Sequence, residues 1–176
     1  WCPLHGWFRR LEKDGEAGSR FFLEVSPFED LSEVVRPRKS PLLRPTPTPS
    51  GIKHVWCTFG HDQVDFNFHD HDLLVELVKI IRSHLDHGIS VFRLDAVAFV
   101  WKELGTECIN LAQTHELVRL FRTLIEHVKP DAVIITETNI PNQENLSYFG
   151  NGNEAHGIYN FSLPPLLLYS LTYGDC

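Results

Sequence analysis

The chain has 176 residues, of which 43% are hydrophobic and 22% charged, a composition typical of a globular protein. The formal net charge of −7 and the lack of a basic stripe exclude nucleic acid as the main partner. No apolar run approaches the roughly 18 residues needed to span a bilayer, so no membrane partner is expected.

The first 55 residues are predicted to be an irregular but ordered excursion. Segment 36–51, RPRKSPLLRPTPTPSG, is interrupted by prolines, which exclude a helix or a central strand. Large apolar groups distinguish the region from a disordered linker. The aromatic residues expected to anchor it are Trp1, Trp7, Phe8, Phe21 and Phe22.

Regular patterns begin near residue 55. Residues 55–59 (VWCTF) favour a strand, and residues 63–68 (QVDFNF) alternate between polar and apolar side chains, as a half-buried strand does. Residues 72–88 (DLLVELVKIIRSHLDHG) predict a helix because the apolar side chains recur at helical spacing. Asp72 suits the N-terminus of this helix, and Gly88 suits the position just beyond its end.

Strands and helices alternate in the rest of the chain. Ile89–Leu94 predicts a buried strand, Leu117–Val128 a helix, and Ala132–Thr136 a second strand rich in β-branched residues. A third strand is expected at Gly157–Phe161, followed by a helix at Leu163–Leu171. Apolar strands connected by helices predict a parallel sheet that is covered on both faces.

Two carboxylates follow two of these strands. Asp95 comes directly after the first strand, and Glu137 comes directly after the second. Functional groups of parallel α/β folds cluster at the carboxyl ends of the strands. We therefore expect Asp95 and Glu137 to lie on adjacent strands of one rim.

Enzymes that cleave glycosidic bonds use a pair of facing carboxylates as their catalytic groups. One attacks the anomeric carbon, and the other protonates the leaving oxygen. Arg93 lies two residues before Asp95, on the same face of the strand, where its charge would keep a nucleophile ionised. The apolar strand before Glu137 would favour the protonated form that a general acid needs. Spacing alone leaves a second interpretation open, in which Arg93 and Asp95 form a structural ion pair and Glu137 caps a helix.

Three segments resemble conserved regions of the α-amylase superfamily, family 13 of the glycoside hydrolases. They are QVDFN (63–67), FRLDAVAF (92–99), which contains the R-x-D motif of the nucleophile strand, and ITETN (135–139), the acid/base strand. Longer stretches, among them VVRPRKSPLL (34–43), resemble the sucrose phosphorylase subfamily, which includes the glucosylglycerate and glucosylglycerol phosphorylases.

The resemblance implies an α/β fold, with residues 56–176 forming part of a catalytic (β/α)8 barrel (TIM barrel) and residues 1–55 an excursion similar to domain B of that family. It implies a fragment of a retaining α-glucosyl phosphorylase. Asp95 would be the nucleophile that forms a β-glucosyl-enzyme, and Glu137 the general acid/base. Inorganic phosphate would replace water as co-substrate, with no organic cofactor and no metal.

The resemblance also implies residues that line the sugar pocket. Arg93 would be the partner of the nucleophile, and Phe59 and Gln63 match pocket positions. Phe99 stands where sucrose phosphorylase has a tyrosine, and Asn139 where it has a histidine. These two departures favour glycerate or glycerol over fructose as the natural acceptor.

Some family features lie outside this sequence. The first barrel strands would precede Trp1, and the third acid would lie on a strand later than any present here. The absence of methionine also indicates a piece of a longer protein. The HDHD run at His69–Asp72 precedes a helix and fits a solvated helix start better than a metal site. His156 is either a pocket residue or a surface histidine, and the pairs Trp101–Lys102 and Tyr148–Phe149 either pack under loops or face sugar.

The four cysteines, Cys2, Cys57, Cys108 and Cys176, lack C-x-x-C spacing, so a metal knuckle is not expected. Reduced thiols in a cytoplasmic protein are the simpler expectation, with a disulfide left open. A homodimer also remains open.

Two further functions compete with the phosphorylase. One is a family 13 hydrolase or transglycosylase acting on sucrose or α-glucans. The other is a non-catalytic family 13-like protein used for interaction, which the presence of both Asp95 and Glu137 disfavours.

Overall fold

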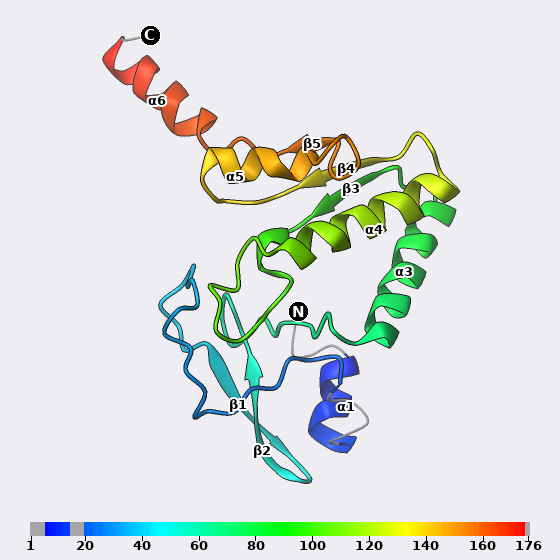
Figure 1. Cartoon of the computed structure of the whole chain (residues 1–176), viewed down its shortest axis with the longest axis vertical. Coiled ribbons are helices and arrows are strands. Elements are labelled where there is room, and N and C mark those ends of the chain that lie inside the picture. The colour runs from blue at the N-terminus through cyan, green and yellow to red at the C-terminus, as the bar shows by residue number, and fades with distance from the viewer. Residues whose placement is uncertain (1–5, 15–19, 175–176) are drawn as a thin grey trace. The chain divides into compact units, whose positions relative to one another are not determined.

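The computed structural model describes residues 6–14 and 20–174 (Figure 1). Contacts divide the chain into two compact units. One comprises the residues up to Ser83 together with Ala98–Thr114, and the other comprises His84–Val97 and the residues from His115 onward. Strand β2 (Gly51–Trp56) runs across the boundary predicted between residues 55 and 56. The assignment of residues 1–55 to a domain B stays a prediction.

The first unit contains more regular structure than the sequence indicated. Residues Gly6–Asp14 form helix α1, and β1 (Leu43–Thr48) pairs with β2 in an antiparallel hairpin. The prediction of an irregular region is therefore wrong for these segments. Prolines are tolerated in β1 because, in the described part of the chain, β1 pairs with β2 on one side only, so a missing N–H can face away from the partner.

Two apolar clusters form the core of this unit. The first joins α1 to the strands through Phe8, Leu11, Phe22, Val55, Cys57 and Val64. The second contains Val25, Val34, Leu42, Trp56 and Cys108. Trp7, Phe8, Phe21 and Phe22 thus anchor the N-terminal region as expected, whereas Trp1 lies outside the described residues.

The expected strands at residues 55–59 and 63–68 are mostly absent. Strand β2 ends at Trp56, and residues 63–68 form only isolated bridges, Gly60 with Gln63 and Phe22 with Phe66. The alternation still has a consequence for packing, because Val64 is 1% exposed. Packing of Val64 and Phe66 onto the first apolar cluster, rather than a continuous ladder, explains the pattern.

The predicted helix after this segment is confirmed as α3 (His71–Asp86). Its first turn is capped by Asp70, whose Oδ1 accepts a hydrogen bond from the N–H of Leu73 at 3.0 Å. Asp72, the expected cap, instead forms an ion pair with Arg20. Gly88 follows the helix with φ of +86°, a conformation that favours glycine.

The second unit contains the predicted parallel sheet. Its strands are β3 (Val91–Leu94), β4 (Val133–Thr136) and β5 (Gly157–Ile158), in the order β3-β4-β5. Both pairings are parallel. Helix α4 (Ala112–Val128) leads from β3 to β4, as Figure 1 shows.

Shorter elements follow β4. Helix α5 (Asn142–Leu146), the 3-10 turn η2 (Ser147–Phe149) and the loop up to Ala155 lead to β5, and helix α6 (Leu163–Tyr173) follows it. A further 3-10 turn, η1 (Val97–Phe99), comes after β3.

Burial in this sheet depends on position. Ile134 of the central strand β4 is fully buried, but Val91 of the edge strand β3 is 56% exposed. In the described part of the chain, the first strand is therefore less buried than predicted, because β3 pairs there with β4 alone. Strand β5 is also shorter than predicted, and α6 has no buried residue.

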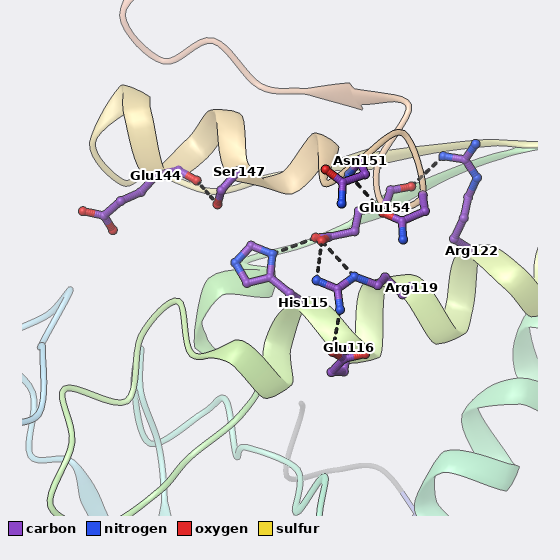
Figure 2. A network of polar contacts seen from close by, with 9 residues as sticks. His115, Glu116, Arg119, Arg122, Glu144, Ser147, Asn151 and Glu154 are labelled. Carbon is purple, nitrogen blue, oxygen red and sulfur yellow. Dashed lines mark hydrogen bonds and ion pairs between the residues drawn. The ribbon is translucent and has the colours of Figure 1, made fainter.

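A buried carboxylate ties the loop before β5 to helix α4 (Figure 2). Glu154 is 1% exposed and contacts His115 Nδ1 at 2.7 Å and Arg119 Nη2 at 3.0 Å. Arg122 donates to the backbone oxygen of Glu154 at 2.6 Å. Gly150, with φ of +55°, approaches this carboxylate so closely that a Cβ there would lie 2.8 Å from Glu154 Oε1. The network anchors the segment that leads into β5.

The cysteines within the described ranges are free. Cys57 and Cys108 are both buried, while Cys2 and Cys176 lie outside the described residues. Burial raises the pKa of Cys57 to about 12, with the nearby Asp65 contributing. The thiol of Cys57 is therefore unreactive near neutral pH.

Candidate active site

Asp95 and Glu137 lie at the carboxyl ends of adjacent parallel strands, as predicted. Leu94, the last residue of β3, is in register with Thr136, the last residue of β4. The N–H of Glu137 donates to the backbone oxygen of Leu94 at 2.9 Å. The backbone pairing thus brings the two carboxylates to the same rim.

Arg93 contacts both carboxylates. Its Nη1 lies 2.8 Å from Asp95 Oδ1, and its Nη2 lies 3.8 Å from Glu137 Oε2. Partial desolvation lowers the pKa of Arg93, but the charge of Asp95, the hydroxyl of Tyr159 and the charge of Glu137 outweigh it, so its pKa lies above the ordinary value. A permanently charged guanidinium therefore bridges the two acids.

Ala96 provides a further contact with Glu137. Its N–H donates to Glu137 Oε2 at 2.9 Å, and its φ of +48° lies in the left-handed region, which residues other than glycine rarely adopt. Such strain persists only where the surroundings enforce it, and it is frequent at functional sites. The turn after Asp95 thus directs a backbone donor at Glu137.

The surroundings of the two acids differ. The side chain of Asp95 is 71% exposed, and that of Glu137 is 19% exposed. Glu137 is the more desolvated acid, as the apolar strand before it suggested. However, an N–H donor and a guanidinium contact it, so its environment is less apolar than the sequence indicated.

Strand β5 brings Tyr159 to the same rim, a residue that the sequence did not single out. The Cζ atom of Arg93 lies 5.1 Å from the centre of the Tyr159 ring, within the range of a cation–π contact. The available signal was positional, since Tyr159 directly follows the third strand, just as Asp95 and Glu137 follow the first two.

The remaining predicted pocket residues fall into two groups. In the first unit, the rings of Phe59 and Phe99 meet edge to face at 5.4 Å, and the N–H of Gln63 donates to the oxygen of Gly60 at 2.9 Å. In the second unit, Asn139 is exposed two residues after Glu137. Their substrate-binding roles stay predictions.

The HDHD run has structural contacts. His69 Nε2 hydrogen-bonds the backbone oxygen of Lys102 at 2.9 Å, and its ring packs on Trp101 at 4.1 Å. Lys102 is itself buried and pairs with Asp65 at 2.8 Å. Among residues 6–14 and 20–174, no group of three histidine, cysteine or acidic side chains could hold a metal ion.

Two further aromatic candidates also have structural contacts. His156 Nδ1 accepts a hydrogen bond from the N–H of Ile134 at 3.0 Å, which places it beside the first half of β4 and not beside Glu137. Tyr148 is buried, and its ring stacks on His115 at 4.5 Å. Tyr148 therefore packs under the loop.

The family described as "Alpha amylase, catalytic domain" matches residues 53–172. Curated relatives include glucosylglycerate phosphorylases. The one from Allomeiothermus silvanus is 44% identical over 170 residues, covering 96% of this chain and 31% of that protein. The one from Spirochaeta thermophila is 47% identical over 162 residues, covering 92% of this chain and 28% of that protein. The chain thus spans under a third of the length of these relatives.

Among solved structures, sucrose 6F-phosphate phosphorylase from Thermoanaerobacter thermosaccharolyticum matches with a TM-score of 0.82 and 20% identity, covering 97% of this chain and 37% of that one. A similarity at this identity shows the fold. The three parallel strands and their helices are therefore part of a (β/α)8 barrel, as predicted. Within the described ranges, no helix has both the length and the apolar character needed to cross a membrane.

Proposed function

Because the chain belongs to the α-amylase catalytic-domain family, we propose that it is part of a retaining phosphorylase that transfers glucose from glucosylglycerate to phosphate. The observation that carries the proposal is the pair Asp95 and Glu137 at one rim, bridged by Arg93. The choice of glucosylglycerate as the glucosyl donor follows from the relatives named glucosylglycerate phosphorylase. The two acids supply the reaction type, since retaining glycosidases use a carboxylate nucleophile and a carboxylic acid as proton donor.

In the first step, a carboxylate oxygen of Asp95 attacks the anomeric carbon of the donor. The bond from that carbon to the glycerate oxygen breaks, and Glu137 gives its proton to the departing oxygen. The guanidinium of Arg93 lies 2.8 Å from Asp95 Oδ1, which restricts the orientation of the nucleophile. The products of this step are glycerate and a β-glucosyl ester on Asp95.

In the second step, a phosphate oxygen attacks the same carbon from the opposite face. The ester bond to Asp95 breaks, and Glu137, now a carboxylate, accepts a proton from the attacking phosphate. Two inversions give α-glucose 1-phosphate with net retention, and both acids return to their starting forms. The reaction needs phosphate as co-substrate and no organic cofactor.

Phe59, Gln63, Phe99 and Asn139 are proposed to contact the sugar or the acceptor. The edge-to-face pair of Phe59 and Phe99 offers an apolar surface of the kind that packs against a sugar ring. Asn139, which is exposed near Glu137, is suited to hydrogen-bond an acceptor group.

The test uses the full-length protein with glucosylglycerate, with and without inorganic phosphate. Formation of glucose 1-phosphate and glycerate in equal amounts, dependent on phosphate, is the expected result. Asp95→Asn, which preserves shape and removes the nucleophile, is the matched control and should form no product. Free glucose released at the same rate with or without phosphate would instead indicate the family 13 hydrolase, and sucrose as a parallel donor tests the alternative substrate.

A further inference from the structure

A buried asparagine connects the ends of β4 and β5 on the side of the two acids. Asn145, in helix α5, is 4% exposed. Its Oδ1 accepts a hydrogen bond from the hydroxyl of Thr138, and its Nδ2 donates to the backbone oxygen of Tyr159 at 2.8 Å. Thr138 directly follows Glu137, and Tyr159 directly follows β5. The oxygen and the nitrogen of one side-chain amide therefore bind Thr138 and Tyr159, the residues next to the rim.

This connection resists displacement. A buried polar group that loses its partner retains the cost of leaving water, so both hydrogen bonds of Asn145 tend to be kept. A third bond, from the N–H of Tyr159 to the oxygen of Thr136 at 3.1 Å, continues the pairing of β4 with β5. The backbone at Tyr159 is thus fixed from two sides.

The side chain of Tyr159 extends this order to Arg93. The guanidinium lies over the ring at 5.1 Å, and the ring of Phe161 packs against Tyr159 at 5.9 Å. Arg93 is 43% exposed and carries a flexible side chain, so a fixed aromatic surface limits the positions that its charged group can take. The position of Arg93 in turn determines how it contacts Asp95 and Glu137.

We infer that Asn145 and Tyr159 are positioning residues for glucosyl transfer. Asn145 holds the ends of β4 and β5 together, and Tyr159 holds Arg93 where it reaches both acids. The inference rests on the proposed function, because that function makes Asp95 the nucleophile and Glu137 the acid/base. Both residues act through Arg93 and Glu137, and a displacement of about 1 Å in such a site can reduce the rate a hundredfold.

The first test measures fluoride release from α-glucosyl fluoride by the full-length protein. Inorganic phosphate at saturating concentration removes the glucosyl group from Asp95 in each turnover, and fluoride leaves without much help from a general acid, so the rate of fluoride release follows attack by Asp95. Tyr159→Leu removes the ring and the hydroxyl and should lower kcat about 10- to 100-fold. Tyr159→Phe keeps the ring, loses the hydrogen bond between the hydroxyl and Arg93, and should lower kcat clearly less than Tyr159→Leu does. Phe28→Leu, which changes an aromatic side chain of the first unit that is 94% exposed, is the control and should leave kcat unchanged.

The second test is the crystal structure of Tyr159→Leu in the full-length protein. The guanidinium of Arg93 should leave its 2.8 Å contact with Asp95. An unchanged contact together with unchanged kcat would overturn the inference, and an equal loss of kcat in the Phe and Leu variants would overturn the role of the ring.

Asn145→Ala, checked for folding by circular dichroism, should lower kcat in the same assay. If this variant fails to fold, the comparison of Tyr159→Leu with Tyr159→Phe still tests the inference. If the wild-type protein released no fluoride, the proposed function would fail, while the crystal structure of Tyr159→Leu would still decide whether Tyr159 positions Arg93.

Discussion

Replacing Glu154 by glutamine should loosen the loop that leads into β5. The change keeps the size of the side chain and removes its charge. Glu154 is 1% exposed and has two charged or chargeable partners, Arg119 and His115. A hydrogen bond to a charged group contributes about 1.5–3 kcal/mol, and a neutral one about 0.5–1.5 kcal/mol. The interaction with each of these two partners should therefore lose about 1 kcal/mol.

The expected total loss of stabilisation is about 2 kcal/mol. This is small for a buried ion pair, because Arg119 is 38% exposed and water can replace part of the interaction. A loss of about 2 kcal/mol corresponds to a roughly 30-fold increase in the opening equilibrium of the loop. Amide hydrogen exchange measures this opening directly. The reporters are the N–H groups of Gly152 and Ala155, which donate to Phe149 and Tyr148 at 2.9 and 2.8 Å.

Glu116→Gln is the matched control for this experiment. Glu116 contacts the same Arg119, but its side chain is 69% exposed, so the pair should contribute under about 0.5 kcal/mol and exchange should change by about twofold at most. If Glu154→Gln accelerated exchange no more than Glu116→Gln does, burial would not be what makes the Glu154 contacts strong, and the reasoning would be refuted.

Four further outcomes are expected. In the full-length protein, Asp95→Asn should lower glucosyl transfer at least about a thousandfold while the circular dichroism spectrum stays unchanged. Glu137→Gln should slow glucosides with poor leaving groups about 10²- to 10⁴-fold and affect α-glucosyl fluoride far less in the first step. Burial lowers the pKa of His156 in the folded protein. Its contribution to the free energy of unfolding is therefore complete above about pH 6.5 and is lost as the pH falls through the lower folded pKa. When the free energy of unfolding in urea is measured against pH, His156→Gln should remove this fall. The 176-residue chain alone should form no glucose 1-phosphate above a blank, because it spans under a third of its relatives and leaves the apolar helix α6 exposed.

Elements with a strong local pattern could be predicted from the sequence. Helices α3 and α4 have apolar residues at helical spacing, and β4 is a short run of β-branched residues, so neighbours along the chain determine their type. The hairpin of β1 and β2 could not be predicted in this way. Its prolines disfavour a strand in general, and only the free side of β1 makes them acceptable.

The residues of the candidate site also differ in whether a local sequence pattern predicts them. Asp95 and Glu137 could be found because each follows a strand, and parallel pairing brings such positions together without any further information. The left-handed backbone of Ala96 has no local signal, since alanine, unlike glycine, asparagine and aspartate, does not adopt this conformation routinely. Its φ of +48° goes with a hydrogen bond to Glu137, which lies on another strand.

Asn145 shows why such residues need the folded structure. The segment NQENL is polar and short, which by itself predicts a solvated helix turn. Its neighbours in α5 follow that expectation, but Asn145 is buried because Thr138 and Tyr159 flank it. Those two residues become neighbours only when β4 and β5 pair in parallel, with Thr136 in register with Ile158. The role of a carboxylate at the rim can be predicted from its position directly after a strand. The groups that position the carboxylate, however, are brought together by strand pairing. A polar residue with no local signal can therefore still control the geometry of the site.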